Sequence, residues 1–287
     1  MKSFNLANGM TVPALGQGTW MLGDEPAHRA GEIQALRAGI AMGATLIDTA
    51  EMYGDGRSES LVGEAIREIP GGMKRDDLFL VSKVLPGNAG RDRILASCEA
   101  SLHRLGVDYL DLYLLHWRGA VPLAETVACM EELVDRGAIR AWGVSNFDID
   151  DMEELWEVPG GQHCQVNQVL CHAGSRGIEF SLLPWMREHG VALMSYCPLA
   201  QAGRIRSGLL EEPALRRIAA KHDATPVQVL LAWNIRDGHT IAIPCTGSAE
   251  HARENADAAN LDLDAGDLGA LDAAFPPPEW KMPLDME

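Results

Sequence analysis

The sequence lacks several features that mark membrane, secreted or nucleic-acid-binding proteins. No stretch approaches the roughly 18 apolar residues of a membrane helix, and the start, MKSFNLANGM, lacks the apolar core of a signal peptide. Positive charge is scarce, since 24 Lys and Arg stand against 41 Asp and Glu, for a formal charge of −17. Such a charge repels DNA, RNA and anionic lipid. We therefore expect a protein that binds neither nucleic acid nor membrane. We also expect it to be cytoplasmic and monomeric.

No two of the six cysteines have the CxxC spacing of redox and zinc motifs. Free thiols are expected, because a chain of 287 residues needs no disulfides to stabilise its core. His163, Cys164, Cys171 and His172 lie close in sequence, but their spacing does not match zinc sites. The sequence therefore predicts no metal, and no fixed Cys–His pair indicates a nucleophile.

Both common glycine-rich phosphate-binding motifs are absent. Gly16-Gln17-Gly18-Thr19-Trp20 gives GxG without the third glycine of GxGxxG, and no GxxxxGK[ST] occurs. The absence argues against an open, doubly wound parallel sheet, whose nucleotide-binding loop follows its first strand.

What is present is an alternation of strand-like and helix-like segments along the chain. Continuous apolar runs, typical of strands covered on both faces, occur at Ala14–Gly18, Thr45–Asp48, Leu78–Lys83, Leu110–His116, Ile139–Ser145, Cys164–Val169, Val191–Tyr196 and Thr240–Pro244. Helical spacing occurs near residues 28–42, 58–69, 94–105, 127–134, 148–157, 178–190 and 213–236.

This alternation predicts an α/β protein with one domain, residues 1–287, folded as a (β/α)8 TIM barrel. Two short apolar runs around Asn8-Gly9 predict a β-hairpin at the N-terminus. The proline-rich end, 276–287, is expected to form a loop over the active-site face of the barrel.

Polar residues stand at the ends of neighbouring predicted strands, where barrels of this kind carry their chemistry. Three successive strands end at Asp48, Lys83 and His116, and Tyr53 lies in the loop after Asp48. One such group alone is usually a solvated surface residue. Four complementary groups that barrel closure brings to one rim favour a catalytic site.

These four residue types suit the protonation of an oxygen. A tyrosine has a pKa near 10, and a nearby ammonium stabilises the phenolate and lowers that pKa. We therefore expect Tyr53 to be a general acid, Lys83 to lower its pKa, Asp48 to hold Lys83, and His116 to orient the substrate oxygen.

Several long motifs resemble the aldo-keto reductases. They are PALGQGTW (13–20), LIDTAEMYGDGRSESLVGEAI (46–66), LFLVSKV (78–84), SLHRLGVDYLDLYLLHW (101–117), GAIRAWGVSNF (137–147), NQV (167–169) and YCPLAQAG (196–203). The motifs are spread over most of the chain, and the four residues above match the family's catalytic tetrad. The AEMY, LLHW, GSRGIE, PLAQAG and LDM patterns look most like a bacterial branch that reduces methylglyoxal and other small aldehydes.

The resemblance implies a barrel that binds NADP(H), with hydride passing from the nicotinamide to a carbonyl carbon. It implies that Ser145, Asn146 and Gln168 hold the carboxamide and that Tyr196 stacks on the nicotinamide. Gly18, Thr19 and Trp20 would line the other side of the ring. The remaining implied cofactor residues are Pro198, Leu199 and Gln201 at the pyrophosphate, Thr246 near the 2′-phosphate, and Glu254 and Asn255 at the adenine.

One segment departs from the family pattern. Cys245 stands where many members have Lys, and His251 where they have Arg, and those cations bind the 2′-phosphate of NADP. Each lost cation could contribute roughly 1.5–3 kcal/mol through a charge-assisted hydrogen bond. We therefore expect NADP(H) as the cofactor, with weaker discrimination against NAD(H) than is usual.

The predicted substrate pocket is apolar and aromatic, with Trp20, Met52, Trp117 and Trp280. No cluster of Arg suggests a phosphorylated substrate, so small neutral aldehydes and ketones are favoured. The sequence thus predicts an NADPH-dependent reductase of small carbonyl compounds, methylglyoxal among them. The alternative is a nucleotide-binding sensor or regulatory barrel with little turnover.

Overall fold

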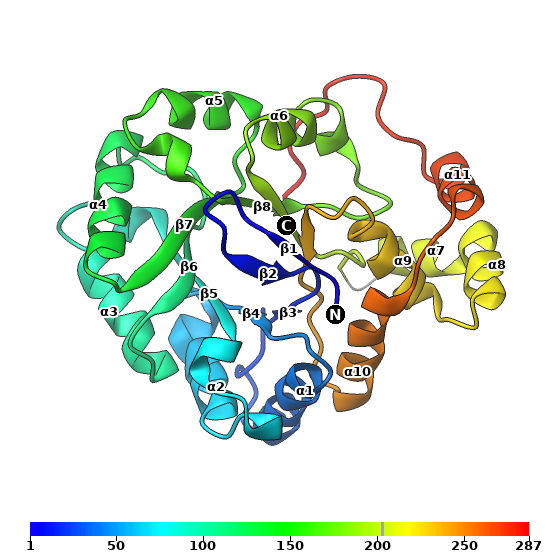
Figure 1. Ribbon diagram of the computed structural model, residues 1–287, viewed down its shortest axis with the longest axis horizontal. Coiled ribbons are helices and arrows are strands. Elements are labelled where there is room, and N and C mark those ends of the chain that lie inside the picture. The colour runs from blue at the N-terminus through cyan, green and yellow to red at the C-terminus, as the bar shows by residue number, and fades with distance from the viewer. Residues whose placement is uncertain (202–203, 287) are drawn as a thin grey trace.

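A computed structural model, which describes residues 1–201 and 204–286, shows a barrel of parallel strands surrounded by helices (Figure 1). Within these residues the strands neighbour one another in chain order: β3 (Gln17–Gly18), β4 (Leu46–Asp48), β5 (Phe79–Val84), β6 (Leu110–Leu115), β7 (Ile139–Ser145), β8 (Val166–Leu170), β9 (Ala192–Tyr196) and β10 (Thr240–Ala242). Each lies within a few residues of a predicted strand.

Main-chain contacts between the first and last of these strands close the barrel. Leu15 and Gly18 form parallel bridges with Ala242 and Cys245, and the Gly16 N–H donates to the Ala242 carbonyl at 2.9 Å. The predicted (β/α)8 barrel is confirmed, and the open doubly wound sheet is wrong. Strand β3 is shorter than predicted because Ala14 lies in a bend and Leu15 pairs with β10 only through an isolated bridge.

The helices form the outer layer of the barrel (Figure 1). They are α1 (Arg29–Ala41), α2 (Arg57–Ile66), α3 (Ile94–Leu105), α4 (Leu123–Asp135), α5 (Ile149–Glu157), α6 (Leu182–Glu188), α7 (Arg204–Glu211), α8 (Pro213–Lys221), α9 (Pro226–Asn234), α10 (Ala249–Asp257) and α11 (Ala265–Ala274). The predicted helix 213–236 is two helices, because Asp223 has a left-handed φ of 50° and Pro226 begins a new helix capped by Thr225. Helices α7, α10 and α11 lie outside the segments in which helical spacing was predicted.

The N-terminal hairpin is confirmed and lies across one end of the barrel, in front in Figure 1. Its strands β1 (Ser3–Asn5) and β2 (Thr11–Pro13) pair antiparallel around Gly9, whose φ is 86°. The hairpin leaves the opposite end, where the strands terminate, open for a site. None of the helices in the described ranges is long and apolar enough to cross a membrane.

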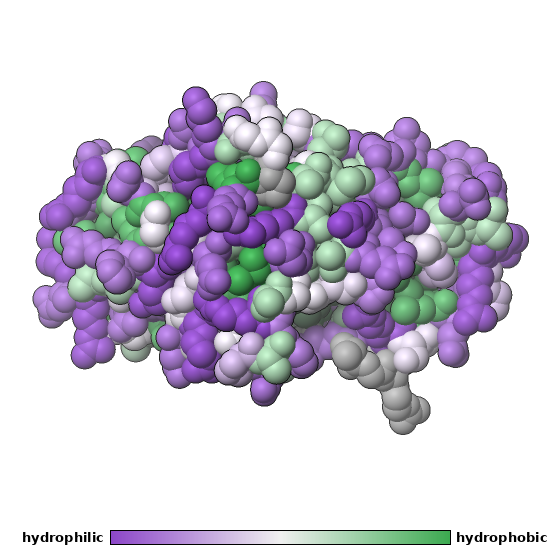
Figure 2. All heavy atoms as spheres, turned by 90° about the horizontal axis from the view of Figure 1, so that it is seen from below, coloured by the Kyte–Doolittle hydropathy of each residue, from purple (hydrophilic) through white to green (hydrophobic). Residues whose placement is uncertain are grey.

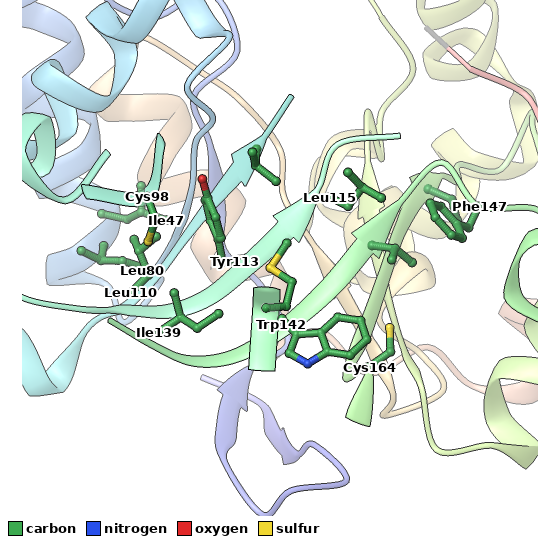
Figure 3. Close-up of a cluster of buried hydrophobic side chains, with 14 of the residues drawn as sticks. Ile47, Leu80, Cys98, Leu110, Tyr113, Leu115, Ile139, Trp142, Phe147 and Cys164 are labelled. Atoms are coloured by element: carbon green, nitrogen blue, oxygen red, sulfur yellow. The ribbon is translucent and has the colours of Figure 1, made fainter. Parts of the chain in front are cut away.

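Alternate side chains of each strand enter two different cores. Leu112 and Leu114 point into the barrel, whereas Tyr113 and Leu115 pack outward against the helices, as the period of two in a strand requires. Figure 3 shows Tyr113, Trp142 and Cys164 in this outer core. Full burial of a large apolar side chain stabilises the fold by about 1.5–3 kcal/mol, so the double core holds the strand ends rigidly.

The C-terminal tail crosses loops that follow strands β7 and β8. The Lys281 ammonium lies 3.5 Å from an Asp148 carboxylate oxygen and 3.3 Å from one of Asp150, and Ser175 donates to Asp285. The tail therefore lies on the face at the carboxyl ends of the strands, as predicted. On the molecular face drawn in Figure 2 the surface is largely hydrophilic, with apolar side chains confined to small patches.

Candidate active site

A cavity of about 380 Å³ opens at the carboxyl ends of the barrel strands. Most residues that the sequence predicted for catalysis and cofactor binding line it: Gly18, Thr19, Trp20, Asp48, Met52, Tyr53, His116, Trp117, Ser145, Asn146, Gln168, Tyr196, Pro198, Leu199, Gln201 and Cys245. The barrel thus brings together segments more than 200 residues apart.

Register and a tight turn place the polar centre of the cavity. Asp48 pairs with Val81, two residues before Lys83, so Asp48 and Lys83 point to the same side of the sheet. Tyr53 begins a 3-10 turn, Tyr53–Gly56, in which Gly54 and Asp55 have left-handed φ values of 57° and 52°. The turn directs the phenol back over the strand end.

Lys83 lies behind Tyr53 and is hydrogen-bonded to two other residues of the predicted catalytic tetrad, Asp48 and Tyr53. Its ammonium donates to the Asp48 carboxylate at 2.7 Å, to the Thr49 carbonyl at 3.0 Å and to the Tyr53 hydroxyl at 3.0 Å. Lys83 and Asp48 are 0% and 2% exposed, so the ion pair is shielded from water. Because the Tyr53 oxygen accepts from Lys83, its own proton is left to donate elsewhere.

Burial dominates the electrostatics of this centre. It raises the pKa of Asp48 and lowers the pKa of Lys83, while their mutual attraction opposes both shifts. Burial, followed by the charge of Asp48, raises the pKa of Tyr53 well above its ordinary value. The pKa of Tyr53 is therefore raised overall, opposite to the net lowering expected from the sequence, because burial outweighs the nearby Lys83 ammonium.

His116 forms one aromatic wall of the cavity. Its ring lies 5.8 Å from the Tyr53 ring and 4.9 Å from the Trp117 ring, between centroids. Burial, assisted by the charge of Lys83, lowers the pKa of His116 to about 3, so the imidazole is neutral. Trp20 meets Tyr53 edge to face at 4.9 Å from the other side.

Amide and hydroxyl groups form the opposite wall. The Tyr196 hydroxyl donates to the Asn146 amide oxygen at 3.0 Å, and the Asn146 amide nitrogen donates to Ser145 Oγ and to the His116 carbonyl, both at 3.2 Å. Gln168 donates to the second Asp48 oxygen at 2.8 Å, which leaves its amide oxygen to accept. The flat ring and the amides are the groups that a nicotinamide carboxamide requires.

A buried hydroxyl network, which sequence reasoning missed, holds the floor of the cavity. Ser58 is fully buried and donates to Thr19 Oγ1 at 2.8 Å, while Thr19 donates to the Asp48 carbonyl at 2.9 Å. Thr49 donates to Ser58 at 3.2 Å. The only signal was the serine five residues after Tyr53, at the start of helix α2.

The residues predicted for the 2′-phosphate and adenine lie beyond Cys245, on and before helix α10. Thr246 and Asn255 line a narrow crevice that shares Gly18 and Pro244 with the main cavity. His251 is exposed on α10, and Glu254 is half-buried beside it. This end carries a buried carboxylate as well, since Glu32 is only 6% exposed. Desolvation, followed by the charges of Glu32 and Asp48, raises the pKa of Cys245 to about 12.

Trp280 is not brought to the cavity. It is 63% exposed and does not line the cavity, because Lys281 and Asp285 hold the tail against the loops after β7 and β8. Conversely, six lining residues were not predicted: Met21, Cys197, Ala200, Arg206, Ile243 and Pro244. Arg206 lies on helix α7, which was not predicted.

The described residues contain no group of three or more His, Cys, Asp or Glu placed to hold a metal ion. Cys164 and Cys171 are buried, and burial raises the pKa of both thiols to about 12, which makes them poor ligands and nucleophiles at neutral pH.

Comparisons with known proteins agree with this site. The model of the aldo/keto reductase family matches residues 14–275. The chain is 50% identical to methylglyoxal reductase YeaE of Escherichia coli over 285 residues, 99% of each chain. It is 34% identical to methylglyoxal reductase DkgB of Salmonella typhi, over 92% of this chain and 93% of the relative. A crystal structure of an aldo/keto reductase from Klebsiella pneumoniae in complex with NADP and acetate superposes with a TM-score of 0.95 at 51% identity, covering 100% of this chain and 99% of that one.

Proposed function

Because the chain belongs to the aldo/keto reductase family, we propose that it reduces small aldehydes and ketones, methylglyoxal among them, with Tyr53 as general acid. Family membership makes the chain an NAD(P)H-dependent oxidoreductase, and the proposal adds the substrate class and the roles of the residues. The observation that carries it is the 3.0 Å hydrogen bond from Lys83 to the Tyr53 hydroxyl at the base of the cavity.

The cavity wall suits a nicotinamide. Tyr196 offers a flat ring, and Asn146 and Gln168 offer amide groups that a carboxamide can bond. When bound, the dinucleotide supplies hydride to a carbonyl carbon. The chain's own residues then bind the ring, exclude water and hold the carbonyl oxygen near Tyr53.

The proton comes from Tyr53. Its raised pKa keeps the phenol protonated at neutral pH, ready to donate as negative charge develops on the carbonyl oxygen. Lys83 stabilises the phenolate that this transfer leaves. Asp48 holds Lys83 in place, and Gln168 in turn donates to Asp48. His116 is neutral and lines the same space, so it can orient the carbonyl by a hydrogen bond without competing for the proton.

The cavity favours small, weakly polar substrates. Trp20, Met52 and Trp117 supply an apolar wall beside Tyr53. The curated relatives that the chain resembles are named methylglyoxal reductases, which agrees with a small aldehyde carrying one further oxygen.

The test is Tyr53→Phe. We expect turnover of methylglyoxal, followed by loss of NADPH absorbance, to fall at least about a hundredfold, because proton transfer by a positioned acid contributes roughly that much. NADPH binding, followed by fluorescence, should stay close to wild type. Tyr109→Phe is the matched control, since Tyr109 lies before strand β6 at the opposite end of the barrel.

Wild-type turnover in the Tyr53→Phe variant would overturn the assignment of the acid. Tight nucleotide binding by the wild-type protein without turnover of any aldehyde in a panel would instead favour a sensor or regulatory barrel.

A further inference from the structure

The turn that carries Tyr53 is covered from outside the barrel by an arginine of another helix. The turn ends at Gly56, whose φ is 85°, and the Arg104 side chain of α3 lies directly on this glycine. A Cβ added to Gly56 would lie 2.5 Å from Arg104 Cδ and 2.6 Å from Nε, so only a glycine leaves room for the arginine. Arg104 therefore limits how far the turn can move outward.

A buried carboxylate holds Arg104 in this place. The Arg104 Nε donates to Glu59 Oε2 at 2.5 Å, and Nη2 donates to Ser101 Oγ at 3.2 Å. The Glu59 side chain, on α2, is 0% exposed, and that of Arg104 is 27% exposed. Helices α2 and α3 are in close contact, since a Cβ added to Gly63 would lie 2.6 Å from the Arg104 carbonyl oxygen. A charge-assisted hydrogen bond in such a shielded position is strong, so the arginine has one fixed placement.

The same carboxylate also holds the strand that carries Lys83. The Ser82 hydroxyl is fully buried and donates to Glu59 Oε1 at 2.6 Å. Successive side chains of a strand point to opposite faces, so Ser82 meets Glu59 outside the barrel while the Lys83 side chain enters it. One oxygen of Glu59 thus holds the strand of Lys83, and the other holds the arginine that lies on the Tyr53 turn.

A second ion pair beside the same turn is much more exposed. Arg57 donates to Asp24 at 2.9 Å next to Gly54, but the two side chains are 54% and 34% exposed. Exposed pairs of this kind contribute little, because water screens their charges. The buried Glu59–Arg104 pair is therefore the contact that can fix the turn.

We infer that the Glu59–Arg104 pair positions Tyr53, so that its hydroxyl stays within hydrogen-bonding distance of the ammonium behind it. Neither member of the pair lines the described wall of the cavity, so the pair acts through Tyr53 and touches neither substrate nor cofactor. The inference rests on the proposed function, in which Tyr53 is the general acid. It adds two positioning residues outside the tetrad to the proton-donor system.

The test is the single-turnover rate at which the NADPH-bound protein reduces methylglyoxal, followed by loss of NADPH absorbance. We expect Arg104→Met to lower this rate about tenfold, because a small displacement of the acid from its productive position is costly. The Kd of NADPH should stay within a factor of about two. Arg104→Lys, which keeps the charge, should recover part of the rate. Arg37→Met is the matched control, since Arg37 is 21% exposed and joins α1 to the other end of α2.

A double-mutant cycle with Tyr53→Phe separates positioning from a general loss of structure. When the hydroxyl is absent, the pair has nothing left to position, so Arg104→Met should change the residual rate of Tyr53→Phe by less than about twofold. A merely structural role would lower the rate by the same factor in both backgrounds.

A second variant covers the case in which Arg104→Met is too unstable to measure. Arg104→Met combined with Glu59→Gln leaves no unpaired charge in the buried site, and the glutamine oxygen can still accept from Ser82. We expect the same loss of about tenfold in this variant, because the arginine that lies on Gly56 is still missing.

Three outcomes would overturn the inference: a wild-type rate in the variants that lack Arg104, an equal loss with and without the Tyr53 hydroxyl, or an equal loss in the Arg37→Met control. Wild-type turnover in Tyr53→Phe would instead contradict the proposed acid, so the two failures are distinguishable.

Discussion

The two ends of the groove around Gly18 are built differently. At the Tyr53 end, Asp48 and Lys83 are almost fully buried, and each is held by at least two hydrogen bonds. At the far end, Cys245, Gly247 and His251 are exposed, and the described residues there present few fixed contacts. A buried network tolerates little change because every lost partner leaves an unsatisfied group.

The two ends should therefore respond differently to substitution. Changes at the Tyr53 end should cost both turnover and stability, because the same bonds serve the chemistry and the barrel. Changes at the Cys245 end should alter cofactor preference and leave stability nearly unchanged, because exposed side chains contribute little to the folded state.

The largest effect is expected from breaking the buried ion pair. Lys83→Met should lower turnover about a hundredfold or more, since the phenolate left by proton transfer loses its ammonium. It should also destabilise the fold by about 3–5 kcal/mol, because it leaves the Asp48 carboxylate buried and unpaired. Steady-state kinetics and urea unfolding measure the two effects.

The double variant Asp48→Asn with Lys83→Met separates the two roles. It removes both charges, so most of the lost stability should return while turnover stays low. Recovery of turnover in the double variant would show that the ammonium is not needed for chemistry.

A smaller effect concerns pH and His116. Its pKa is about 3 in the folded protein and near 6.5 in the unfolded chain, so below pH 6.5 the unfolded state binds a proton that the folded state does not. Stability from the neutral imidazole is present above pH 6.5 and is lost as pH falls toward 3. His116→Gln should therefore reduce the loss of unfolding free energy between pH 7 and pH 5 by about 2 kcal/mol.

Chemical denaturation at the two pH values measures this difference, with His103→Gln, on the outer helix α3, as the control. An equal loss of stability in wild type and His116→Gln would contradict the neutral, buried state of His116. Turnover of the wild type should also show no titration of an imidazole between pH 5 and 8.

The sequence sufficed for the barrel and the tetrad for a physical reason. Apolar runs covered on both faces indicate parallel strands, and a polar residue that ends such a run falls at one rim of a closed barrel. Asp48, Lys83 and His116 were found by this rule, and Tyr53 by its place in the next loop.

Other features depend on contacts that the sequence does not encode locally. The pKa direction of Tyr53 follows from burial beside a neutral ion pair, which only the packed structure shows. The path of Trp280 is set by distant partners of Lys281 and Asp285. Arg206 was missed because helix α7 has only eight residues and lies shortly after the Pro198–Gln201 loop in the chain.

The smallest effect is expected at the exposed end and concerns the choice of cofactor. Cys245→Lys should lower the Kd of NADPH about tenfold and leave that of NADH within a factor of two, because only NADPH carries a 2′-phosphate. Cys245→Met is the control for added bulk without charge. Fluorescence titration of both dinucleotides measures the ratio, and an equal change for both would show that position 245 lies away from the 2′-phosphate.

Glu32 places a carboxylate near the same end of the groove. Its carboxylate accepts from the Gly23 N–H at 2.9 Å, and a Cβ added to Gly247 would lie 3.3 Å from Glu32 Cγ, so the carboxylate lies beside the turn that is expected to bind the 2′-phosphate. Glu32→Gln keeps an oxygen that can accept the Gly23 bond and should tighten NADPH by about threefold through lost repulsion. In the Cys245→Lys background, the gain in NADPH affinity from Glu32→Gln should differ from threefold. The introduced ammonium is then no longer attracted to Glu32 and interacts only with the phosphate. A change in NADH affinity as large as that for NADPH would show that Glu32 acts on the whole cofactor, and the two ends of the groove would then not be energetically separate.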